Sequence, residues 1–362
     1  MDVINKNDCT GCMACMNICP RKAINIYEDN EGFKFPKINQ DLCINCGLCK
    51  KVCPVINKME ENTYNIKAYA CKNKNLESRL KSSSGGVFIL LAKYIIKNGG
   101  VVFGARFNEK LEVIHDYTDK EENIKLFMGS KYVQSNINDS YKKAKKFLLE
   151  NKLVLFTGTP CQIEGLLKYL GKDYENLYTQ DIICHGVPSP KLWKKYLEYL
   201  KEKNGKIPKT VNFRRKDIAG WNNYQVNYIY DKNEENVHHN DDIYMNLFLE
   251  NIALRNSCYH CKFKKTARKS DITIADFWGI DNINPKINDE KGISAVLINS
   301  KKGERLFESI RKDIEYYNAD ITSIEKYNPC LNHAVTYNEK RKDFFYDLDH
   351  INFDELIEKY IK

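Results

Sequence analysis

The amino-acid sequence predicts an α+β protein in two unequal parts: a short cysteine-rich module, then a larger α/β body with a mixed sheet and a mostly helical C-terminal tail. Three observations predict this class. Eight of the 14 cysteines lie in the first 53 residues. Helical and strand-like apolar patterns alternate between residues 85 and 299, and helical patterns dominate after Lys302. A chain of 362 residues that is 43% hydrophobic can bury a core and is not largely disordered.

Charge and hydropathy narrow the class of protein further. The chain carries 57 basic and 48 acidic side chains, a formal charge of +9. Up to residue 62 we count eight basic and eight acidic side chains, so the excess lies in the body. No apolar run is long enough to span a bilayer, since the best one, 87–96, contains Lys93. The first residues lack the layout of a signal peptide, so we expect a cytoplasmic protein.

The cysteine-rich module contains one motif twice, with an offset of 34 residues. The two runs are Cys9-x2-Cys12-x2-Cys15-x3-Cys19-Pro20 and Cys43-x2-Cys46-x2-Cys49-x3-Cys53-Pro54. Three closely spaced thiolates wrap one corner of a 4Fe–4S cube, and the fourth is carried to the other cube. We therefore expect one cluster on Cys9, Cys12, Cys15 and Cys53, and another on Cys43, Cys46, Cys49 and Cys19. Zinc is the alternative, but zinc sites use two C-x2-C pairs.

This repeat resembles the bacterial two-cluster ferredoxin over about residues 1–60. Between the two runs, residues 23–27 and 33–38 predict short strands around the turn 29–32. The expected domains are the ferredoxin module at 1–62, a first part of the body at 63–150, a second part at 151–310 and a helical tail at 311–362.

The body shows strand and helix signals in alternation. Helices are expected at 85–97, 140–151, 160–170 and 190–203, and strands at 101–107, 111–117, 153–157, 177–184, 210–215, 224–230, 271–277 and 294–299. Residues 153–157 form a continuous apolar run, which is typical of a strand that is buried on both faces. The helix at 160–170 begins with a proline at its first turn. The pattern predicts a mixed sheet with helical connections.

Four further cysteines form a second set in the body. Cys161 and Cys184 each follow a predicted strand, and Cys258-x2-Cys261 precedes one. The ends of strands are where an α/β sheet gathers its site residues, so these thiols can meet at one metal centre. On spacing alone the alternatives remain open: zinc on these four, zinc on three of them with His260, or buried cysteines with no ligand. Cys71 and Cys330 have no partner at a useful spacing and are expected to be free thiols.

Six segments in this order resemble the family of coenzyme F-420 hydrogenase/dehydrogenase beta subunits, in the form that carries an N-terminal ferredoxin domain. The segments are 81–87, 129–135, 158–162, 184–186, 258–261 and 275–279. The resemblance covers about residues 1–300 and implies that the body binds FAD and one more 4Fe–4S cluster. It also implies that Cys161, Cys184, Cys258 and Cys261 hold that cluster.

A flavin site can be argued from the residues as well. Hydroxyls and nearly bare amides precede the helix at 85–97, in Ser82, Ser83, Ser84, Gly85 and Gly86. The free N–H groups of such a helix start bind phosphate, and FAD carries a diphosphate. An ordinary serine N-cap is the alternative. Further flavin or substrate contacts are expected from Ser130, Lys131 and Tyr132, for which an ordinary polar loop is the alternative. Gln162 and Asp276 are weaker candidates, since each could contact flavin, a cluster or only the backbone.

Three other features concern charged or polar side chains, and two of them are expected to be structural. The charged segment 213–216 and Asn222 could line a pocket, but a solvated face is expected. His185 is expected to be structural. The basic run 262–269 lies beside the second cysteine set and is expected to attract an acidic partner, either a ferredoxin or the deazaflavin cofactor. No nucleic-acid signature accompanies this run, so we expect no nucleic-acid partner.

Together these features predict an iron–sulfur flavoprotein oxidoreductase that passes electrons between ferredoxin-type clusters and FAD, and so reduces or oxidises a soluble cofactor or substrate. One alternative is a coenzyme F-420 (deazaflavin) dehydrogenase. Another is an electron-transfer subunit of a larger redox complex, with no substrate of its own. The sequence identifies no catalytic residue.

Overall fold

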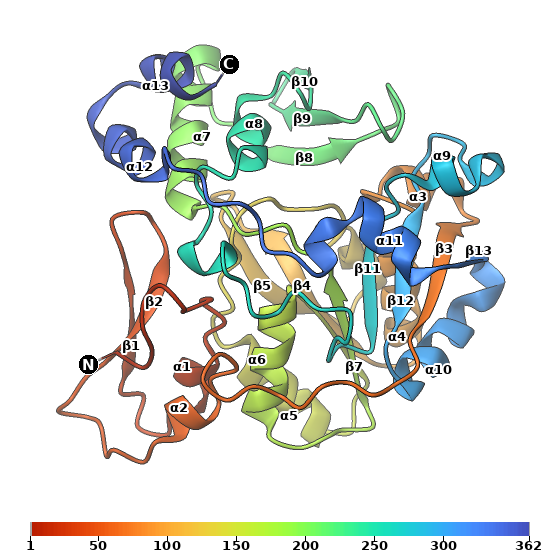
Figure 1. Ribbon diagram of the computed structural model, residues 1–362, viewed down its shortest axis with the longest axis horizontal. Coiled ribbons are helices and arrows are strands. Elements are labelled where there is room, and N and C mark those ends of the chain that lie inside the picture. The colour runs from red at the N-terminus through yellow and green to blue at the C-terminus, as the bar shows by residue number, and fades with distance from the viewer. Residues whose placement is uncertain (1, 362) are drawn as a thin grey trace.

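In the computed structural model, which describes residues 2–361, the chain forms a small N-terminal module, a large sheet with helices on both faces, and a smaller sheet with its own helices (Figure 1). The helices are α1 (Ala14–Ile18), α2 (Leu48–Lys51), α3 (Leu76–Leu80), α4 (Val87–Lys97), α5 (Ser140–Leu149), α6 (Pro160–Leu170), α7 (Pro190–Asn204), α8 (Ile243–Leu249), α9 (Ile280–Ile283), α10 (Lys301–Ile310), α11 (Ile321–Tyr327), α12 (Arg341–His350) and α13 (Phe353–Tyr360). The strands are β1 (Ile24–Glu28), β2 (Lys34–Ile38), β3 (Lys67–Asn73), β4 (Val101–Phe107), β5 (Val113–Thr118), β6 (Val154–Thr157), β7 (Leu177–Ile182), β8 (Thr210–Arg215), β9 (Gln225–Ile229), β10 (Glu234–His238), β11 (Ile272–Asp276), β12 (Ser294–Ile298) and β13 (Ile314–Ala319).

The large sheet has eight strands in the order β13-β3-β12-β11-β7-β6-β4-β5. Strands β4, β6, β7 and β11 are parallel, and the other neighbours pair antiparallel. Every residue of β6 is buried, as its continuous apolar sequence predicts. Because β6 and β7 are parallel neighbours, Cys161 and Cys184, which follow them, are brought to the same edge of the sheet.

Successive residues of the parallel strands face two helical layers. On one face Phe103 of β4 and Phe156 of β6 pack with residues of α5 and α6. On the other face Val102 and Leu155, their neighbours in sequence, pack with α4 and α10. Successive side chains of a strand point to opposite faces of the sheet. Because these strands are apolar at successive positions, both faces of the sheet are covered by helices.

The smaller sheet has the order β10-β9-β8 and is antiparallel. Its apolar face shares one core with α7, α8, α12 and α13. Trp193 of α7 joins this core to the large sheet, because its Nε1 donates to the carbonyl of Leu111 (2.8 Å) and its ring stacks on Phe107 of β4. The position of β8 relative to the large sheet is therefore fixed.

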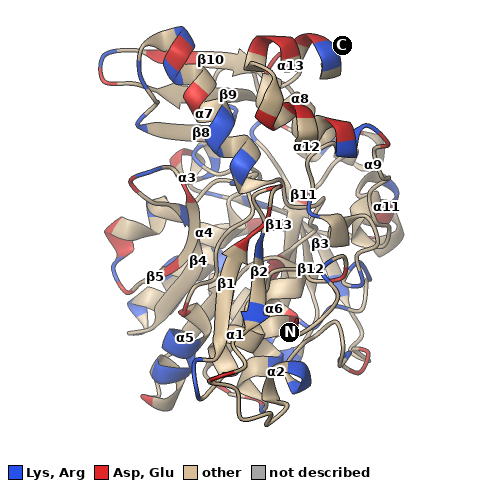
Figure 2. Cartoon of the chain, turned by 90° about the vertical axis from the view of Figure 1, so that its left-hand side faces the viewer, with Lys and Arg blue, Asp and Glu red and all other residues tan. Residues whose placement is uncertain are grey.

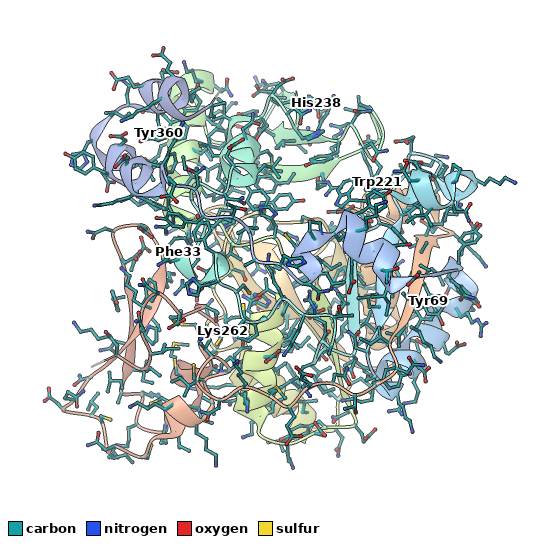
Figure 3. The ribbon with its side chains drawn as sticks, viewed as in Figure 1. Phe33, Tyr69, Trp221, His238, Lys262 and Tyr360 are labelled. Atoms are coloured by element: carbon teal, nitrogen blue, oxygen red, sulfur yellow. The ribbon has the colours of Figure 1, made fainter. Side chains whose placement is uncertain are left out.

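The N-terminal module is fastened to the body by its β1–β2 hairpin, whose strands pair antiparallel (Figure 1). At the hairpin turn the carboxylate of Glu31 pairs with Arg341 of α12. The Nζ of Lys191, on α7, donates to the carbonyl of Asn30 (2.6 Å). Phe33, labelled in Figure 3, packs edge-on against Phe345 of α12. These contacts fix the orientation of the module on the body.

The predicted fold class is confirmed, and most predicted elements lie where their periodicity placed them. Strands β3 and β10 and the edge strand β13 were not predicted, and β13 makes the start of the C-terminal tail extended rather than helical. Residues 63–150 and 151–310 contribute strands to the same large sheet, so the predicted boundary at residue 150 lies inside one layer. Between residues 2 and 361 the chain has no helix with the length and apolar character needed for a bilayer crossing.

Candidate functional site

The eight cysteines of the N-terminal module line two cavities. Cys9, Cys12, Cys15 and Cys53 line the one that we call the inner cavity. The outer cavity is lined by Cys19, Cys43, Cys46 and Cys49. Each spans about 360 Å³ of space free of protein atoms, part of which is open to solvent. In each cavity three thiols come from one cysteine run and the fourth comes from the other run, which is the crossed grouping that the spacing predicts.

Glycines at the same position of the two motifs turn the chain around these cavities. Gly11 (φ +71°) and Gly47 (φ +73°) lie in the left-handed region, which a residue with a Cβ rarely adopts. A Cβ on Gly11 would also lie 2.7 Å from the side-chain amide of Gln134 and 3.0 Å from the guanidinium of Arg255. Side chains of the body therefore close the loop that carries Cys12.

The inner thiols lie in a desolvated environment. Burial, together with the neighbouring thiolates of Cys53 and Cys9, raises the pKa of Cys12 to about 12. The pKa of Cys15 is raised well above its usual range for the same reasons. The hydroxyl of Thr10, between Cys9 and Cys12, is buried and has no partner among the described residues. A metal cluster fits this site, because it stabilises the thiolates and its sulfides accept a hydrogen bond.

The four body cysteines are also close neighbours. Cys161 is the second residue of α6, Cys184 follows β7, and Cys258 ends a short 3-10 helix, Asn256–Cys258. Burial raises the pKa of Cys161 and Cys184, and thiolates of the same set raise both further. Burial, together with the neighbouring Cys261, raises the pKa of Cys258 to about 11. The structure thus brings together the set that the sequence predicts.

The inner cavity and the body set lie side by side. Phe263 and Val55 form a small core with Cys53, and Cys161 and Cys261 pack against it. In Figure 3 the yellow sulfur atoms gather near the labelled Lys262, between the N-terminal module and α6. Cysteines of the inner cavity and of the body set therefore share one apolar contact.

The described thiols do not have the geometry of a site for a single metal ion. Within residues 2–361, no group of three or more histidine, cysteine, aspartate or glutamate side chains is close enough to hold one metal ion. His260, a candidate zinc ligand in the sequence, lies 3.5 Å from the carboxylate of Asp8.

The serine–glycine loop before α4 is held mostly by the protein itself. The hydroxyls of Ser82 and Ser84 donate to the carbonyls of Ser78 and Ile293. The hydroxyl of Ser83 instead accepts from the backbone N–H of Ser130 (2.8 Å), which joins the loop to the predicted segment 129–135. Gly86 (φ 78°) precedes α4, whose start has no side-chain cap. Gly85 has no room for a Cβ, which would lie 2.6 Å from the backbone nitrogen of Ser294.

Three cations surround this loop. The Nζ of Lys131 donates to the carbonyl of Met128, and burial lowers the pKa of that amine to about 7. Lys216 donates to the carbonyl of Ser84, and burial lowers its pKa to about 7 as well. The guanidinium of Arg214 pairs with Asp276 at 2.9 and 3.0 Å and donates to the hydroxyl of Tyr132. Its Nε is buried without a partner among the described residues.

Arg214 and Lys216 correct a prediction, because the charged segment 213–216 was expected to be a solvated face. Their exposed fractions are 3% and 2%. Arg214 lies between the rings of Tyr224 (4.1 Å) and Trp278 (5.1 Å). Lys216 lies just beyond β8, and the pairing register of β8 with β9 shifts between Asn212 and Arg215, so strand alternation does not report this burial. Asn222, in contrast, contacts the exposed carboxylate of Glu290.

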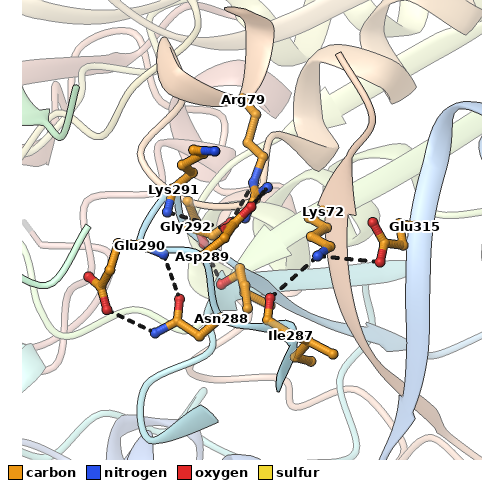
Figure 4. Close-up of polar contacts among 12 residues, drawn as sticks. Lys72, Arg79, Ile287, Asn288, Asp289, Glu290, Lys291, Gly292 and Glu315 are labelled. Atoms are coloured by element: carbon orange, nitrogen blue, oxygen red, sulfur yellow. Dashed lines mark hydrogen bonds and ion pairs between the residues drawn. The ribbon is translucent and has the colours of Figure 1, made fainter. Parts of the chain in front are cut away.

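A loop at 287–292 closes one side of this site, and Figure 4 shows its polar contacts. Arg79 of α3 holds the loop by donating to the carbonyl of Gly292 (2.8 Å) and to the carboxylate of Asp289. Gly292 (φ +93°) then lies against the site, because a Cβ there would be 2.7 Å from the carbonyl oxygen of Ser84. The loop therefore limits the space beside Lys216.

Gln162 has an internal role. Its Oε1 accepts from the backbone N–H of Thr159, which completes a capping box at the start of α6. Its Nε2 donates to the hydroxyl of Ser135 (2.9 Å), which also bonds Nδ1 of His115. Both ends of the amide are used, so Gln162 connects the helix of Cys161 to the segment 129–135.

The basic run 262–269 is partly paired within the molecule. Lys265 pairs with Glu164, Lys262 lies 3.4 Å from Asp8, and the buried Arg268 pairs with Asp181. Lys264 donates to the carbonyl of His185 and, like Lys269, makes no ion pair in the described part of the chain. Attraction of an acidic partner at this run stays a prediction.

His185 has the structural contacts expected of it. Its Nε2 lies 2.6 Å from the Oδ1 of Asn251, and its Nδ1 lies 3.7 Å from the sulfur of Cys330. Burial lowers its pKa. Cys71, the other unassigned thiol, is buried in β3.

The chain is similar to known proteins over two segments that contain these cysteines. Residues 151–323 match the family described as the C terminus of the coenzyme F420 hydrogenase/dehydrogenase beta subunit, and residues 8–57 match the 4Fe-4S dicluster domain. One subunit of the F(420)H(2) dehydrogenase of Methanosarcina mazei is 23% identical over 87% of this chain and 85% of its own length. The coenzyme F420-dependent sulfite reductase of Methanocaldococcus jannaschii is 25% identical over 52% of this chain, which spans only 29% of that protein.

Among solved structures, a chain of the F420-reducing [NiFe] hydrogenase complex from Methanosarcina barkeri aligns with a TM-score of 0.48 and 16% identity, over 75% of this chain and 93% of that chain.

The fold and the dicluster match define an iron–sulfur protein with a fused ferredoxin-type module. More particularly, residues 151–323 carry the C-terminal domain of the coenzyme F420 hydrogenase/dehydrogenase beta-subunit family. The resemblance drawn from the sequence motifs is confirmed over these two matched segments.

Proposed function

We infer that this protein is an iron–sulfur flavoprotein oxidoreductase, in which ferredoxin-type 4Fe–4S clusters and a bound FAD exchange electrons to reduce or oxidise a soluble cofactor or substrate. One observation carries this proposal. Three sets of four thiols lie in series, and the second and third sets touch the same small core around Phe263. A continuous row of such sites connects a surface of the ferredoxin module to the interior of the body.

The proposed ligands follow the three sets. Cys19, Cys43, Cys46 and Cys49 hold an outer cluster, Cys9, Cys12, Cys15 and Cys53 hold an inner cluster, and Cys161, Cys184, Cys258 and Cys261 hold a third. When bound, clusters supply one-electron chemistry and FAD supplies two-electron chemistry. The chain itself excludes water, since all four inner thiols are nearly buried. The ion pair of Glu31 with Arg341 also fastens the module to the body.

The proposed diphosphate site is the loop of Ser82–Gly86 with its surrounding cations. The amines of Lys131 and Lys216 contact only backbone carbonyls, so neither has a carboxylate partner in the described part of the chain. The Nε of Arg214 is a further donor, and it has no hydrogen-bond partner in the described part of the chain. An anion at the uncapped start of α4 would offset these charges and accept from the free N–H groups of the helix.

The electron partners are proposed from the same family context. Both curated relatives bear names that refer to coenzyme F420, so a deazaflavin is our first choice of two-electron partner. An acidic ferredoxin is the proposed one-electron partner. A second candidate function is an electron-transfer subunit of a larger redox complex. The Methanosarcina mazei relative favours it, because its name makes it one part of a dehydrogenase.

Anaerobic preparations of the full chain would test the proposal. Denaturation should release FAD, and the bound flavin should bleach with reduced deazaflavin or with reduced ferredoxin. Lys131→Met should lose flavin, whereas Lys125→Met, at an exposed position nearby, should retain it. Clusters without any flavin would contradict the flavoprotein proposal and leave the electron-transfer subunit. Bound flavin that neither reductant bleaches would contradict both proposed electron partners.

A further inference from the structure

The outer cavity differs from the inner one in its contact with solvent. Cys46 is exposed, whereas all four inner thiols are nearly buried. Two large apolar side chains beside the outer cavity are also uncovered, Ile44 at 59% exposed and Leu42 at 45%. Exposed apolar side chains around a polar or charged rim are typical of a protein interaction site.

Basic side chains form the rim of this surface. Arg21, Lys22, Lys50 and Lys51 are exposed, and none of them makes an ion pair with any residue of the described chain. Figure 2 shows the last two as blue on α2. Within five residues of these four cations the sequence has no acidic residue. The ferredoxin module is neutral in total, so its positive charge is concentrated at the outer cavity.

We propose that this outer rim, made of Leu42, Ile44, Arg21, Lys22, Lys50 and Lys51, is the docking face for a small acidic protein that carries single electrons. The inference rests on the proposed function and adds the location and charge of the partner. Complementary charge raises the association rate and orients the partner, and the apolar centre excludes water from the contact. In each encounter the carrier is oxidised by one electron, the chain is reduced by one electron, and no bond changes.

Binding and electron transfer would be measured separately on the full chain. Calorimetry of the oxidised chain with an oxidised acidic ferredoxin reports binding, and stopped-flow absorbance with the reduced ferredoxin reports transfer. The variant Lys22→Glu/Lys51→Glu reverses the charge of the rim. Lys194→Glu/Lys201→Glu is the matched control, because both lysines are exposed on α7, at the opposite end of the molecule (Figure 1).

The rim variant should weaken binding and slow electron transfer by about tenfold or more at low ionic strength. The difference between variant and wild type should decrease as salt is added. The control variant and reduction by dithionite should stay within about twofold of the wild type. Equal binding by rim variant and wild type would overturn the proposal, as would tighter binding of a basic carrier protein of similar size. Since no substrate is present, failure here is distinct from failure of the proposed oxidoreductase function.

A separate observation concerns Arg255, which is 1% exposed. Its Nε donates to the carbonyl of Cys9 (2.6 Å), its Nη1 to the Oε1 of Gln134 (3.0 Å), and its Nη2 to the carbonyl of Lys34 (3.1 Å). The guanidinium also lies 4.1 Å from the ring centre of Phe35. All these partners are neutral, and no carboxylate of the described chain lies within ion-pair distance of Arg255.

A buried guanidinium without a counter-ion is strongly unfavourable. Arg255 lies where two proposed anions meet, because it bonds the backbone of Cys9 and directly precedes the 3-10 helix that ends in Cys258. Ser257 in that helix donates to the same carbonyl of Cys9 (3.2 Å). The inner ligand loop and the body ligand loop are thus bonded through Arg255 and its neighbour.

We propose that Arg255 is a positioning residue that also compensates the negative charge of the thiolate-bound inner cluster, and so favours its reduced state. This step rests on the assignment of Cys9, Cys12, Cys15 and Cys53 as its ligands. Net charge and hydrogen bonds near the cysteines set the potential of such a cluster. Removal of one buried positive charge must therefore make reduction harder.

Redox titration of the full chain, followed by EPR, would test Arg255→Met against Arg255→Lys. Arg79→Met is the matched control, since Arg79 is 4% exposed but has a carboxylate partner in Asp289. Arg255→Met should lower the equilibrium constant for reduction of the inner cluster at least tenfold, which is about 59 mV for one electron. Arg255→Lys and Arg79→Met should stay within about threefold of the wild type.

Iron analysis covers the case in which a variant does not bind its iron–sulfur cluster. Loss of iron in Arg255→Met with retention in Arg255→Lys supports the charge compensation. Loss of iron in both variants would show that cluster binding depends on the hydrogen bonds of the guanidinium and not on its charge, which overturns the proposal. An unchanged potential in a fully loaded Arg255→Met would overturn it as well.

Discussion

Gly165 of α6 packs directly against Cys12, because a Cβ on Gly165 would lie 3.1 Å from the Cβ and the sulfur of that cysteine. The same position would be 3.0 Å from the hydroxyl of Tyr141. Since α6 also carries Cys161, one helix places a thiol of the body beside the inner cavity of the ferredoxin module. The absence of a side chain at Gly165 permits this approach.

A larger residue at this position should displace Cys12. We expect Gly165→Val to lose about four iron atoms per chain, because overpacking moves a proposed ligand of the inner cluster. Lys168→Val, on the same helix, introduces the same β-branched residue away from the thiols and should keep its iron. Full iron content in Gly165→Val would show that the contact with Cys12 is not needed for cluster assembly.

The crossed grouping of cysteines can be tested with a double variant. Cys19 and Cys43 line the same cavity although they belong to different runs. Cys19→Ala, Cys43→Ala and the double variant should each lose the same cluster, about four iron atoms. If each run held its own cluster, the double variant would lose about eight. Cys19→Ala/Cys9→Ala is the matched control, in which the account expects both module clusters to be lost.

The pair of Arg214 and Asp276 should contribute strongly to stability. Asp276 accepts two hydrogen bonds from Arg214 and one from the indole of Trp221 (2.8 Å). Asp276→Asn would leave the guanidinium buried without its counter-ion, which should lower the free energy of unfolding by about 3 kcal/mol. Urea denaturation would measure this loss. Glu234→Gln breaks the exposed pair with Arg215 and should give no measurable change.

Much of this architecture can be predicted from local sequence. The spacing of Cys9 to Cys19 and its repeat predict the crossed cavities, because the relevant geometry lies within a few residues of each thiol. The proline that opens α6 and the continuous apolar sequence of β6 predict those elements for the same reason.

Contacts between distant segments were not predictable in this way. Arg255 is 246 residues from Cys9, whose carbonyl it bonds, and no periodicity reports such a contact. The burial of Arg214 and Lys216 depends on the packing of the small sheet over the loop of Ser84. The edge strand β13 pairs with β3, about 240 residues earlier in the chain, so its short local pattern does not distinguish it from a helical tail.

The two buried amines near Ser83 predict that the free energy of unfolding depends on pH. Burial lowers the pKa of both Lys131 and Lys216 to about 7, whereas an unfolded lysine titrates near 10.4. Between these values the unfolded chain binds more protons, so the free energy of unfolding should rise from about pH 7 towards about pH 10. Chemical denaturation at several pH values would measure this slope, which Lys131→Met should reduce.

The pH dependence of ligand affinity should have the opposite sign. A diphosphate binds best when both amines are charged, so the affinity for ADP, the nucleotide half of FAD, should fall as the pH rises from about 6 to about 9. Calorimetry would follow this change in the wild type and in Lys131→Met, where the dependence should weaken. An affinity that is flat or rises with pH would argue against a diphosphate beside these amines.

The central claim is that twelve thiols of this chain hold three iron–sulfur clusters in series. Metal analysis of an anaerobic preparation tests it most directly. The account predicts about twelve iron atoms and no zinc per chain, and Cys258→Ala should lower the iron to about eight while leaving the signals of both ferredoxin-type clusters in the EPR spectrum. About eight iron atoms with one zinc in the wild type would contradict the account.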